Sequence, residues 1–164
     1  MITFLKLEEQ HQHKNGGGWV ANTATVEETA YIGPDARIYG YARISGNAWV
    51  FGNARIYGYA RISGNSRIYG TTRVYGNARI SGNARVCGGA WKTSPLYIQG
   101  SCHAITNCSY GKLSIGCITH SFSEWKKLYK SIGKEQGYTP AQIKEYGQLI
   151  ALATKIGKKA KRGK

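Results

Sequence analysis

Between residues 20 and 86, an aliphatic residue returns at every sixth position without interruption. Two residues before each aliphatic stands a small residue, such as Ala36 before Ile38. Residues two apart in a strand share one face, so both side chains are expected to point inward. The aliphatic positions are Val20, Val26, Ile32, Ile38, Ile44, Val50, Ile56, Ile62, Ile68, Val74, Ile80 and Val86. This period predicts a series of short strands that all face one core.

A tight bend is expected between successive strands, because Gly-Asn pairs such as Gly46-Asn47 and Gly64-Asn65 follow them. Gly and Asn tolerate the backbone angles that tight bends require. Strand and bend alternating at a fixed period predict a solenoid. Each six-residue unit can bury its apolar face only by stacking on its neighbours.

The number of faces follows from the residues after each aliphatic, which are expected to point outward. Their identity returns every 18 residues. The clearest series are Tyr39, Tyr57 and Tyr75, and Ser45, Ser63 and Ser81. Three six-residue units therefore make one coil, and the coil is expected to have a triangular cross-section.

This pattern resembles the hexapeptide-repeat proteins, in which a small residue precedes an aliphatic by two positions. It departs from them after the aliphatic, where only Ile32-Gly33 carries the usual Gly. The resemblance implies an all-β solenoid of the left-handed parallel β-helix type, often assembled as a homotrimer. Units such as residues 53–58 (NARIYG), followed by the segment around Cys117 and His120, also resemble hexapeptide-repeat proteins common in phage and prophage genomes.

The repeat loses its register at Lys92, which stands where an aliphatic is due. The next apolar residues fall at a spacing of 17 instead of 18, and the coil is expected to continue irregularly to about Gly116. Three segments are therefore expected. They are an N-terminal strand and polar loop over 1–17, the repeat β-helix over 18–117, and a helical C-terminal cap with a basic tail over 118–164.

The C-terminal appendage is expected to contain two helices. Ser123 can cap the first, Gly137 ends it, and Thr139, Pro140 and Gln142 have the residue types of a second helix start. The apolar stripes are Trp125, Leu128, Tyr129 and Ile132 in the first helix, and Ile143, Tyr146, Leu149, Ile150, Ala153 and Ile156 in the second. Such helices are expected to cover the open end of the solenoid or to pack on neighbouring subunits.

Charge is distributed unevenly along the chain. It carries 23 Lys and Arg against 8 Asp and Glu, a formal net charge of +15. Residues 36 to 123 contain no Asp or Glu, yet an Arg precedes most aliphatics. These are Arg37, Arg43, Arg55, Arg61, Arg67, Arg73, Arg79 and Arg85. Stacked about 4.8 Å apart, neighbouring charges repel by roughly 1 kcal/mol even in water, so a negative partner is expected.

The candidate binding residues combine this charge with aromatic rings. Arginine forks match phosphate oxygens, and rings stack on bases, which favours a nucleotide or nucleic-acid surface. The residues expected to hold phosphate are Arg37, Arg55, Arg67, Arg73 and Arg85, and those expected to stack are Trp49, Tyr57 and Tyr69. Tyr and Arg are also enriched in protein interfaces, so subunit packing or an acidic host protein is an alternative partner. Cation–π contacts between the columns would soften the repulsion without any ligand.

Residues for catalysis are scarce in the repeat. No His lies between residues 20 and 86, so only His103 or His120 could serve a CoA-dependent acyltransferase as a general base. Cys102, His103, Cys108, Cys117 and His120 could form a metal cluster, but buried thiols are the favoured interpretation. We therefore expect no catalytic residue, no metal and no cofactor.

The expected function is a non-catalytic oligomeric binding protein for an anionic ligand. If the phage resemblance holds, it would sequester a nucleotide signal or inhibit a host defence enzyme. The alternatives are an acyltransferase and a purely structural trimer or interaction scaffold. No signal peptide is visible, and no apolar run approaches the roughly 20 residues of a membrane helix. A cytoplasmic location, in a bacterial host if the protein is phage-encoded, is expected.

Overall fold

The computed structural model describes residues 9–159, and the chain divides into two compact units. The described part of the first unit comprises residues 9–83 and 87–94. That of the second comprises residues 84–86 and 95–159. Each unit has its own sheets, and each is described by itself.

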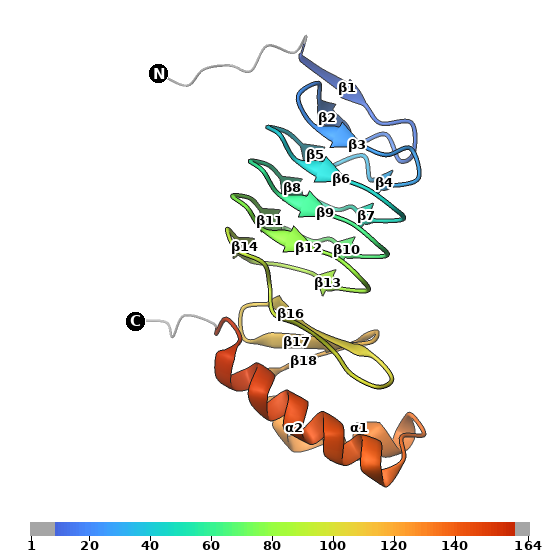
Figure 1. The fold of residues 1–164 in the computed structure, drawn as a ribbon, viewed down its shortest axis with the longest axis vertical. Coiled ribbons are helices and arrows are strands. Elements are labelled where there is room, and N and C mark those ends of the chain that lie inside the picture. The colour runs from blue at the N-terminus through green and yellow to red at the C-terminus, as the bar shows by residue number, and fades with distance from the viewer. Residues whose placement is uncertain (1–8, 160–164) are drawn as a thin grey trace. The chain divides into compact units, whose positions relative to one another are not determined.

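The first unit is a parallel β-solenoid of stacked coils, each contributing short strands to different sheets (Figure 1). Its strands are β1 (Gln10–Gln12), β2 (Trp19–Ala21), β3 (Thr25–Val26), β4 (Tyr31–Ile32), β5 (Arg37–Ile38), β6 (Arg43–Ile44), β7 (Trp49–Val50), β8 (Arg55–Ile56), β9 (Arg61–Ile62), β10 (Arg67–Ile68), β11 (Arg73–Val74), β12 (Arg79–Ile80) and β14 (Ala90–Trp91). The parallel solenoid predicted from the repeat is confirmed.

Three parallel sheets form the faces of this solenoid. The Tyr face consists of β2, β5, β8, β11 and β14, the Ser face of β3, β6, β9 and β12, and the Trp face of β4, β7 and β10. Residues 18 apart are in register, as in the pairings of Arg37 with Arg55 and of Arg55 with Arg73. Strand β1 pairs with β2 in the antiparallel direction.

The core of the solenoid is the predicted stack of small and aliphatic residues. Ala36, Ala54 and Ile56 are fully buried, while the arginines beside them in strands such as β8 and β9 are exposed. At the corners, glycines such as Gly40 and Gly58 adopt φ values of 64° and 66°. A Cβ on Gly40 would lie 2.9 Å from the nitrogen of Gly58, so glycine is required by both the turn and the next coil.

The second unit contains an antiparallel sheet followed by two helices. Its elements are β13 (Arg85–Val86), β15 (Tyr97–Gln99), β16 (Ala104–Ser109), β17 (Lys112–Ile115), β18 (Ile118–Ser121), α1 (Phe122–Glu135) and α2 (Pro140–Ile156). Strands β15 to β18 pair in sequence order, each antiparallel to the next. The two helices predicted at the C-terminal end are confirmed.

The expected irregular coil up to Gly116 is therefore wrong. Strands β16 and β17 are longer than the two-residue strands of the solenoid, and Gly111, with φ 72°, forms the hairpin between Ser109 and Lys112. The apparent slip from 18 to 17 residues reflects antiparallel pairing, in which spacing along the chain no longer measures a coil.

Helix α1 begins earlier than expected. Its N-cap is Ser121 rather than Ser123, because only Ser121 has an acidic residue three positions later to complete a capping box. The amide of Glu124 donates to Ser121 Oγ over 3.2 Å, and the amide of Ser121 donates to the Glu124 carboxylate over 2.8 Å. Gly137, with φ 74°, follows the end of α1 as expected.

Helix α2 starts as the sequence predicts, with Thr139 as the N-cap and Pro140 as the first residue. Buried Trp125 on α1 and Tyr146 and Ile150 on α2 pack with Ile105 and Leu113 of the sheet. Two residues predicted to lie in the apolar stripes are exposed instead, since Leu128 is 39% and Ile156 is 57% accessible. No helix in residues 9–159 has the length and apolar character that a membrane crossing requires.

Part of the expected terminal segments lies outside the described residues. Strand β1 falls within the predicted N-terminal segment 1–17, but residues 1–8 are not described. Residues 160–164, which hold most of the basic tail, are not described either.

Candidate functional site

The Tyr face carries two parallel columns of outward side chains. Arg37, Arg55 and Arg73 occupy one column in register, and all three are exposed. The second column consists of stacked tyrosines. The ring centroids of Tyr39 and Tyr57 are 4.8 Å apart, and those of Tyr57 and Tyr75 are 5.1 Å apart. We call these residues the arginine column and the tyrosine column of the Tyr face.

The arginine column has no internal counter-charge. Within residues 9–159, no carboxylate lies within 4 Å of an arginine nitrogen, and the ion pairs are Lys14 with Glu28 and His120 with Glu124. Other carboxylates hold backbone groups: Glu27 accepts from the amide of Gly46 over 2.7 Å. The positive charge of the face is therefore left to solvent ions or to a ligand.

The tyrosine column remains a set of neutral hydrogen-bonding groups near neutral pH. Burial, together with neighbouring Tyr57, raises the pKa of Tyr39 above its usual value, although Arg55, Arg73 and Arg37 act in the opposite direction. The Tyr39 phenol therefore keeps its proton and does not neutralise the arginines.

A polar cleft lies at the end of the Tyr face nearest β2. It is lined by Trp19, Pro34, Asp35, Arg37, Asn53 and Arg55. Trp19 is in register with Arg37, which in turn pairs with Arg55, so ring and guanidinium groups occupy successive coils. Guanidinium forks bind phosphate or carboxylate, and the amide of Asn53 and the carboxylate of Asp35 add hydrogen-bonding groups of both kinds.

The predicted binding residues are not brought together in one place. Arg37, Arg55, Arg73 and Tyr57 lie on the Tyr face, whereas Trp49, Arg67 and Tyr69 lie on or beside strands of the Trp face. Arg85 belongs to the second unit, where its amide donates to Thr106 Oγ1 over 3.3 Å. A single site built from all of them is therefore not what the chain forms.

On the Trp face, the arginine and the aromatic residues contact each other. The Arg67 guanidinium lies over the Trp49 ring at 5.8 Å from its centroid, and the Phe51 and Tyr69 rings stack at 5.2 Å. Such a cation–π contact partly satisfies the charge of Arg67. The charge on the Tyr face is therefore the less compensated of the two.

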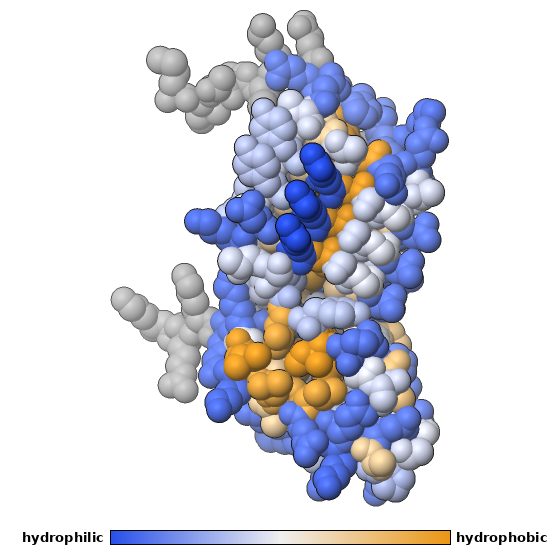
Figure 2. Space-filling view, in the orientation of Figure 1, coloured by the Kyte–Doolittle hydropathy of each residue, from blue (hydrophilic) through white to orange (hydrophobic). Residues whose placement is uncertain are grey.

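Sequence reasoning missed a second aromatic pair, Tyr41 and Tyr59, at the corner between the Tyr face and the Ser face. Both are exposed, at 58% and 63%, and their rings stack at 5.5 Å with planes 10° apart. The signal was present in the sequence, since Tyr replaces the Asn that follows Gly in most of the other turns. Figure 2 shows a column of strongly hydrophilic side chains along the solenoid.

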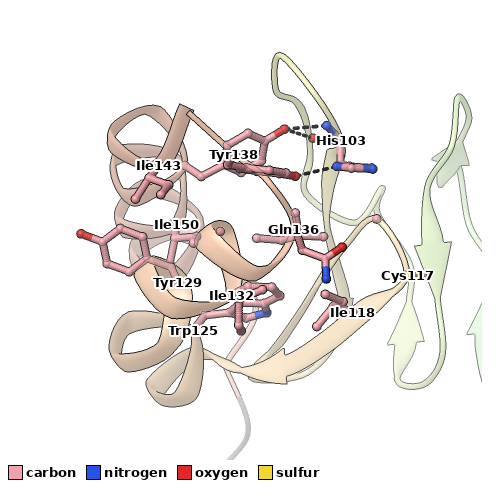
Figure 3. A pocket seen from close by; sticks show the side chains of 14 residues that line it. His103, Cys117, Ile118, Trp125, Tyr129, Ile132, Gln136, Tyr138, Ile143 and Ile150 are labelled. Carbon is pink, nitrogen blue, oxygen red and sulfur yellow. Dashed lines mark hydrogen bonds between the residues drawn. The ribbon is translucent and has the colours of Figure 1, made fainter. Parts of the chain in front are cut away.

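The histidines considered for acyl transfer both lie in the second unit. His103 Nδ1 is 2.6 Å from the Tyr138 hydroxyl, and the Tyr146 hydroxyl donates to the backbone oxygen of His103 (Figure 3). Burial raises the pKa of Tyr138 well above its usual value, so its phenol stays protonated. His120 packs edge-on against Trp125, with ring centroids 5.2 Å apart.

The cavity beside His103 is small and apolar. It encloses about 50 Å³ between α1, α2 and the antiparallel sheet, and its walls include Trp125, Ile132, Ile143 and Ile150. Ligand pockets usually enclose roughly 300 to 1,000 Å³. The cavity is too small for CoA or a nucleotide.

The proposed metal cluster is not assembled. Cys108 is buried, whereas Cys102 and Cys117 are exposed. Among residues 9–159, no three His, Cys, Asp or Glu side chains lie close enough together to hold a metal ion. Cys108 fits the predicted role of a small apolar core residue.

Comparison with known proteins gives one match, and it falls on the solenoid. The family described as YdcK beta solenoid repeat matches residues 42–58, 72–88 and 78–91. No curated protein and no solved structure matches the chain. Sequence match and structure agree that this is a repeat β-solenoid protein whose coils are similar to the YdcK repeat.

Proposed function

We propose that this protein is a non-catalytic binding protein whose arginine column on the Tyr face holds an anionic ligand. The observation that carries the proposal is the register of Arg37, Arg55 and Arg73, all exposed, with no carboxylate of the described residues in ion-pairing range. Neighbouring charges at about 4.8 Å repel by roughly 1 kcal/mol in water. A bound anion offsets this cost and forms charge-assisted hydrogen bonds.

A nucleotide is the ligand class that fits the polar cleft best. Its phosphates would lie on Arg37 and Arg55, and its ring would pack against Trp19. Asp35 can accept hydrogen bonds from ribose hydroxyls or from base amino groups. The cleft thus offers a partner to each part of a nucleotide.

The wider biological role follows from the sequence resemblance. Hexapeptide-repeat proteins are often homotrimers, and we propose that this chain forms a left-handed, trimeric assembly in which the Trp face makes subunit contacts. Exposed Trp49 and neighbouring Phe51 are residue types that protein interfaces enrich. In a phage-encoded protein, such an assembly would sequester a nucleotide signal or inhibit a host defence enzyme in the bacterial cytoplasm.

The test begins with protein purified gently from cells. Ligand released by heat is identified by mass analysis, and its binding is then measured for the parent and for Arg55→Glu/Arg73→Glu. The double variant is expected to lose binding while keeping its oligomeric state. Lys126→Glu/Lys127→Glu changes the charge equally on α1 and is expected to bind normally.

Two results would overturn the proposal. In one, the Arg55→Glu/Arg73→Glu variant binds the released anion as tightly as the parent does. In the other, parent protein binds neither a released ligand nor added mononucleotides. Loss of the oligomer together with binding would assign the arginine column to subunit packing instead.

A further inference from the structure

The exposed tyrosines Tyr41 and Tyr59 contribute little to the solenoid itself. Their amides donate to Gly58 and Gly76 oxygens over 2.9 Å, bonds that any residue other than proline could make. The turn geometry comes from the preceding Gly40 and Gly58. With rings 58% and 63% exposed, neither side chain adds to the core. Their chemistry therefore faces outward.

The outer faces of this aromatic pair are open. In the same column, one coil before and one coil after, the chain has Thr23 and Asn77. Each tyrosine thus has one ring face against its partner, at 5.5 Å, and the other beside a short side chain. A planar ring of a ligand can stack on either outer face without displacing protein atoms.

An arginine column follows the aromatic pair on the Ser face. Arg43 and Arg61 stand two residues after Tyr41 and Tyr59, they are in register with each other, and both are exposed. Arg79 continues the column. The hydroxyls of Ser45 and Ser63 stand beyond it on the same strands. Aromatic platforms beside a line of positive charge are the features with which proteins hold single-stranded nucleic acid.

We propose that the corner between the Tyr face and the Ser face binds single-stranded nucleic acid. Bases stack on the outer faces of Tyr41 and Tyr59, and phosphates lie along Arg43, Arg61 and Arg79. Stacking is tolerant of sequence because every base has an aromatic face. The surface is separate from the nucleotide cleft, so this inference stands whether or not the cleft binds a nucleotide.

Other occupants fit the corner less well. A second copy of the chain would have to present carboxylates, yet Glu27, Glu28, Glu124 and Glu145 already bind a backbone amide, a lysine, a helix cap and Ser101. Double-stranded DNA would satisfy the arginines but not the tyrosines, because its bases are stacked inside the duplex. The exposed rings therefore favour a single strand.

The test measures binding of a fluorescein-labelled oligodeoxythymidylate of about 12 nucleotides, a length within the range of known single-strand sites, by fluorescence anisotropy. Tyr41→Ala/Tyr59→Ala is expected to weaken binding by roughly 10-fold or more. Tyr41→Phe/Tyr59→Phe retains the rings and is expected to bind like the parent. Asn47→Ala/Asn65→Ala alters the equivalent turn position at the next corner and serves as the matched control.

A second measurement tests the arginines. Arg43→Gln/Arg61→Gln is expected to weaken binding and to reduce the slope of log affinity against log salt by about 1 to 2. The same variants are assayed with duplex DNA, for which the alanine replacements of the tyrosines should change affinity little.

Each remaining outcome is decisive. Parent protein that does not bind the oligonucleotide, or that binds it equally well without the tyrosine rings, overturns the inference. Loss of the oligomer in the alanine variant assigns the corner to subunit contact. Oligonucleotide binding that depends only on Arg55 and Arg73 overturns this inference while supporting the anion-binding proposal for the Tyr face.

Discussion

At the scale of single residues, Gly58 combines two requirements that can be separated by mutation. Its φ is 66°, and an added Cβ would lie 3.0 Å from the nitrogen of Gly76 in the next coil. Gly137 has a similar φ of 74° but open space around it. We expect Gly137→Ala to lower the free energy of unfolding by about 1 kcal/mol and Gly58→Ala by more, measured by urea denaturation. Equal losses would show that the coils separate without cost.

The buried aliphatics set the stability of the solenoid. Ile56 is fully buried between coils, so Ile56→Ala should lower the free energy of unfolding by about 2 to 5 kcal/mol and Ile56→Val by about 0.5 to 1.5 kcal/mol. Urea denaturation of both variants checks this ratio. Neighbouring Arg55→Ala removes a repelling exposed charge and should change stability by less than about 0.5 kcal/mol. A large loss there would mean that the arginine has a stabilising partner.

Residue identities along the repeat were predictable where burial dictates them. Ala54 and Ile56 occupy inward positions because strand geometry alternates the two sides of the chain. Tyr41 and Tyr59 were not recognised, because turn positions face solvent and their side chains are not constrained by packing. The positions that the core leaves free are those where a binding function can be placed.

At the scale of elements, the cap of α1 should make its stability depend on pH. Hydrogen bonds from the side chain and backbone of Ser121 lower the pKa of Glu124 below its usual value. The carboxylate therefore stabilises the folded state above the unfolded pKa of about 4.3, and this contribution is lost as the pH falls through the lower folded value. We expect Glu124→Gln to destabilise the protein near pH 7 and to differ little from the parent near pH 2.

Urea denaturation at both pH values provides the measurement. Glu135 lies at the end of α1 and outside the cap, so Glu135→Gln is the matched control and should not lower stability near pH 7. A Glu124→Gln effect of equal size at both pH values would contradict the assigned role of the carboxylate.

Elements with a fixed period were predicted well, and those without one were not. The strands from β2 to β12 follow from spacing alone, because each coil must place an aliphatic at the same point. The antiparallel strands β15 to β18 have no such constraint, and their pairing depends on hairpins such as the one at Gly111. The candidate surfaces were only partly predictable for the same reason: the arginine columns are periodic, whereas the cleft at Trp19 and Asp35 forms once.

At the scale of the whole molecule, a formal charge of +15 makes stability responsive to polyanions. Inorganic tripolyphosphate should raise the Tm of the parent, since a ligand at 100 times its Kd stabilises the folded state by about 2.7 kcal/mol. Arg55→Ala/Arg73→Ala should show a smaller rise, and Lys126→Ala/Lys127→Ala the same rise as the parent. Thermal unfolding at several ligand concentrations checks the prediction. Equal rises in all three proteins would indicate non-specific screening.

The 18-residue register of the coils also bears on how such a protein can change in evolution. Removing residues 55–72 would join Ala54 to Arg73 and leave every inward position, turn and face in place. A duplication of the same length would add a coil in the same way. Unequal recombination within the gene can therefore change the number of arginines in each column in whole steps. The reach of the binding surface along a ligand is then a heritable length, adjustable without redesigning any part of the fold.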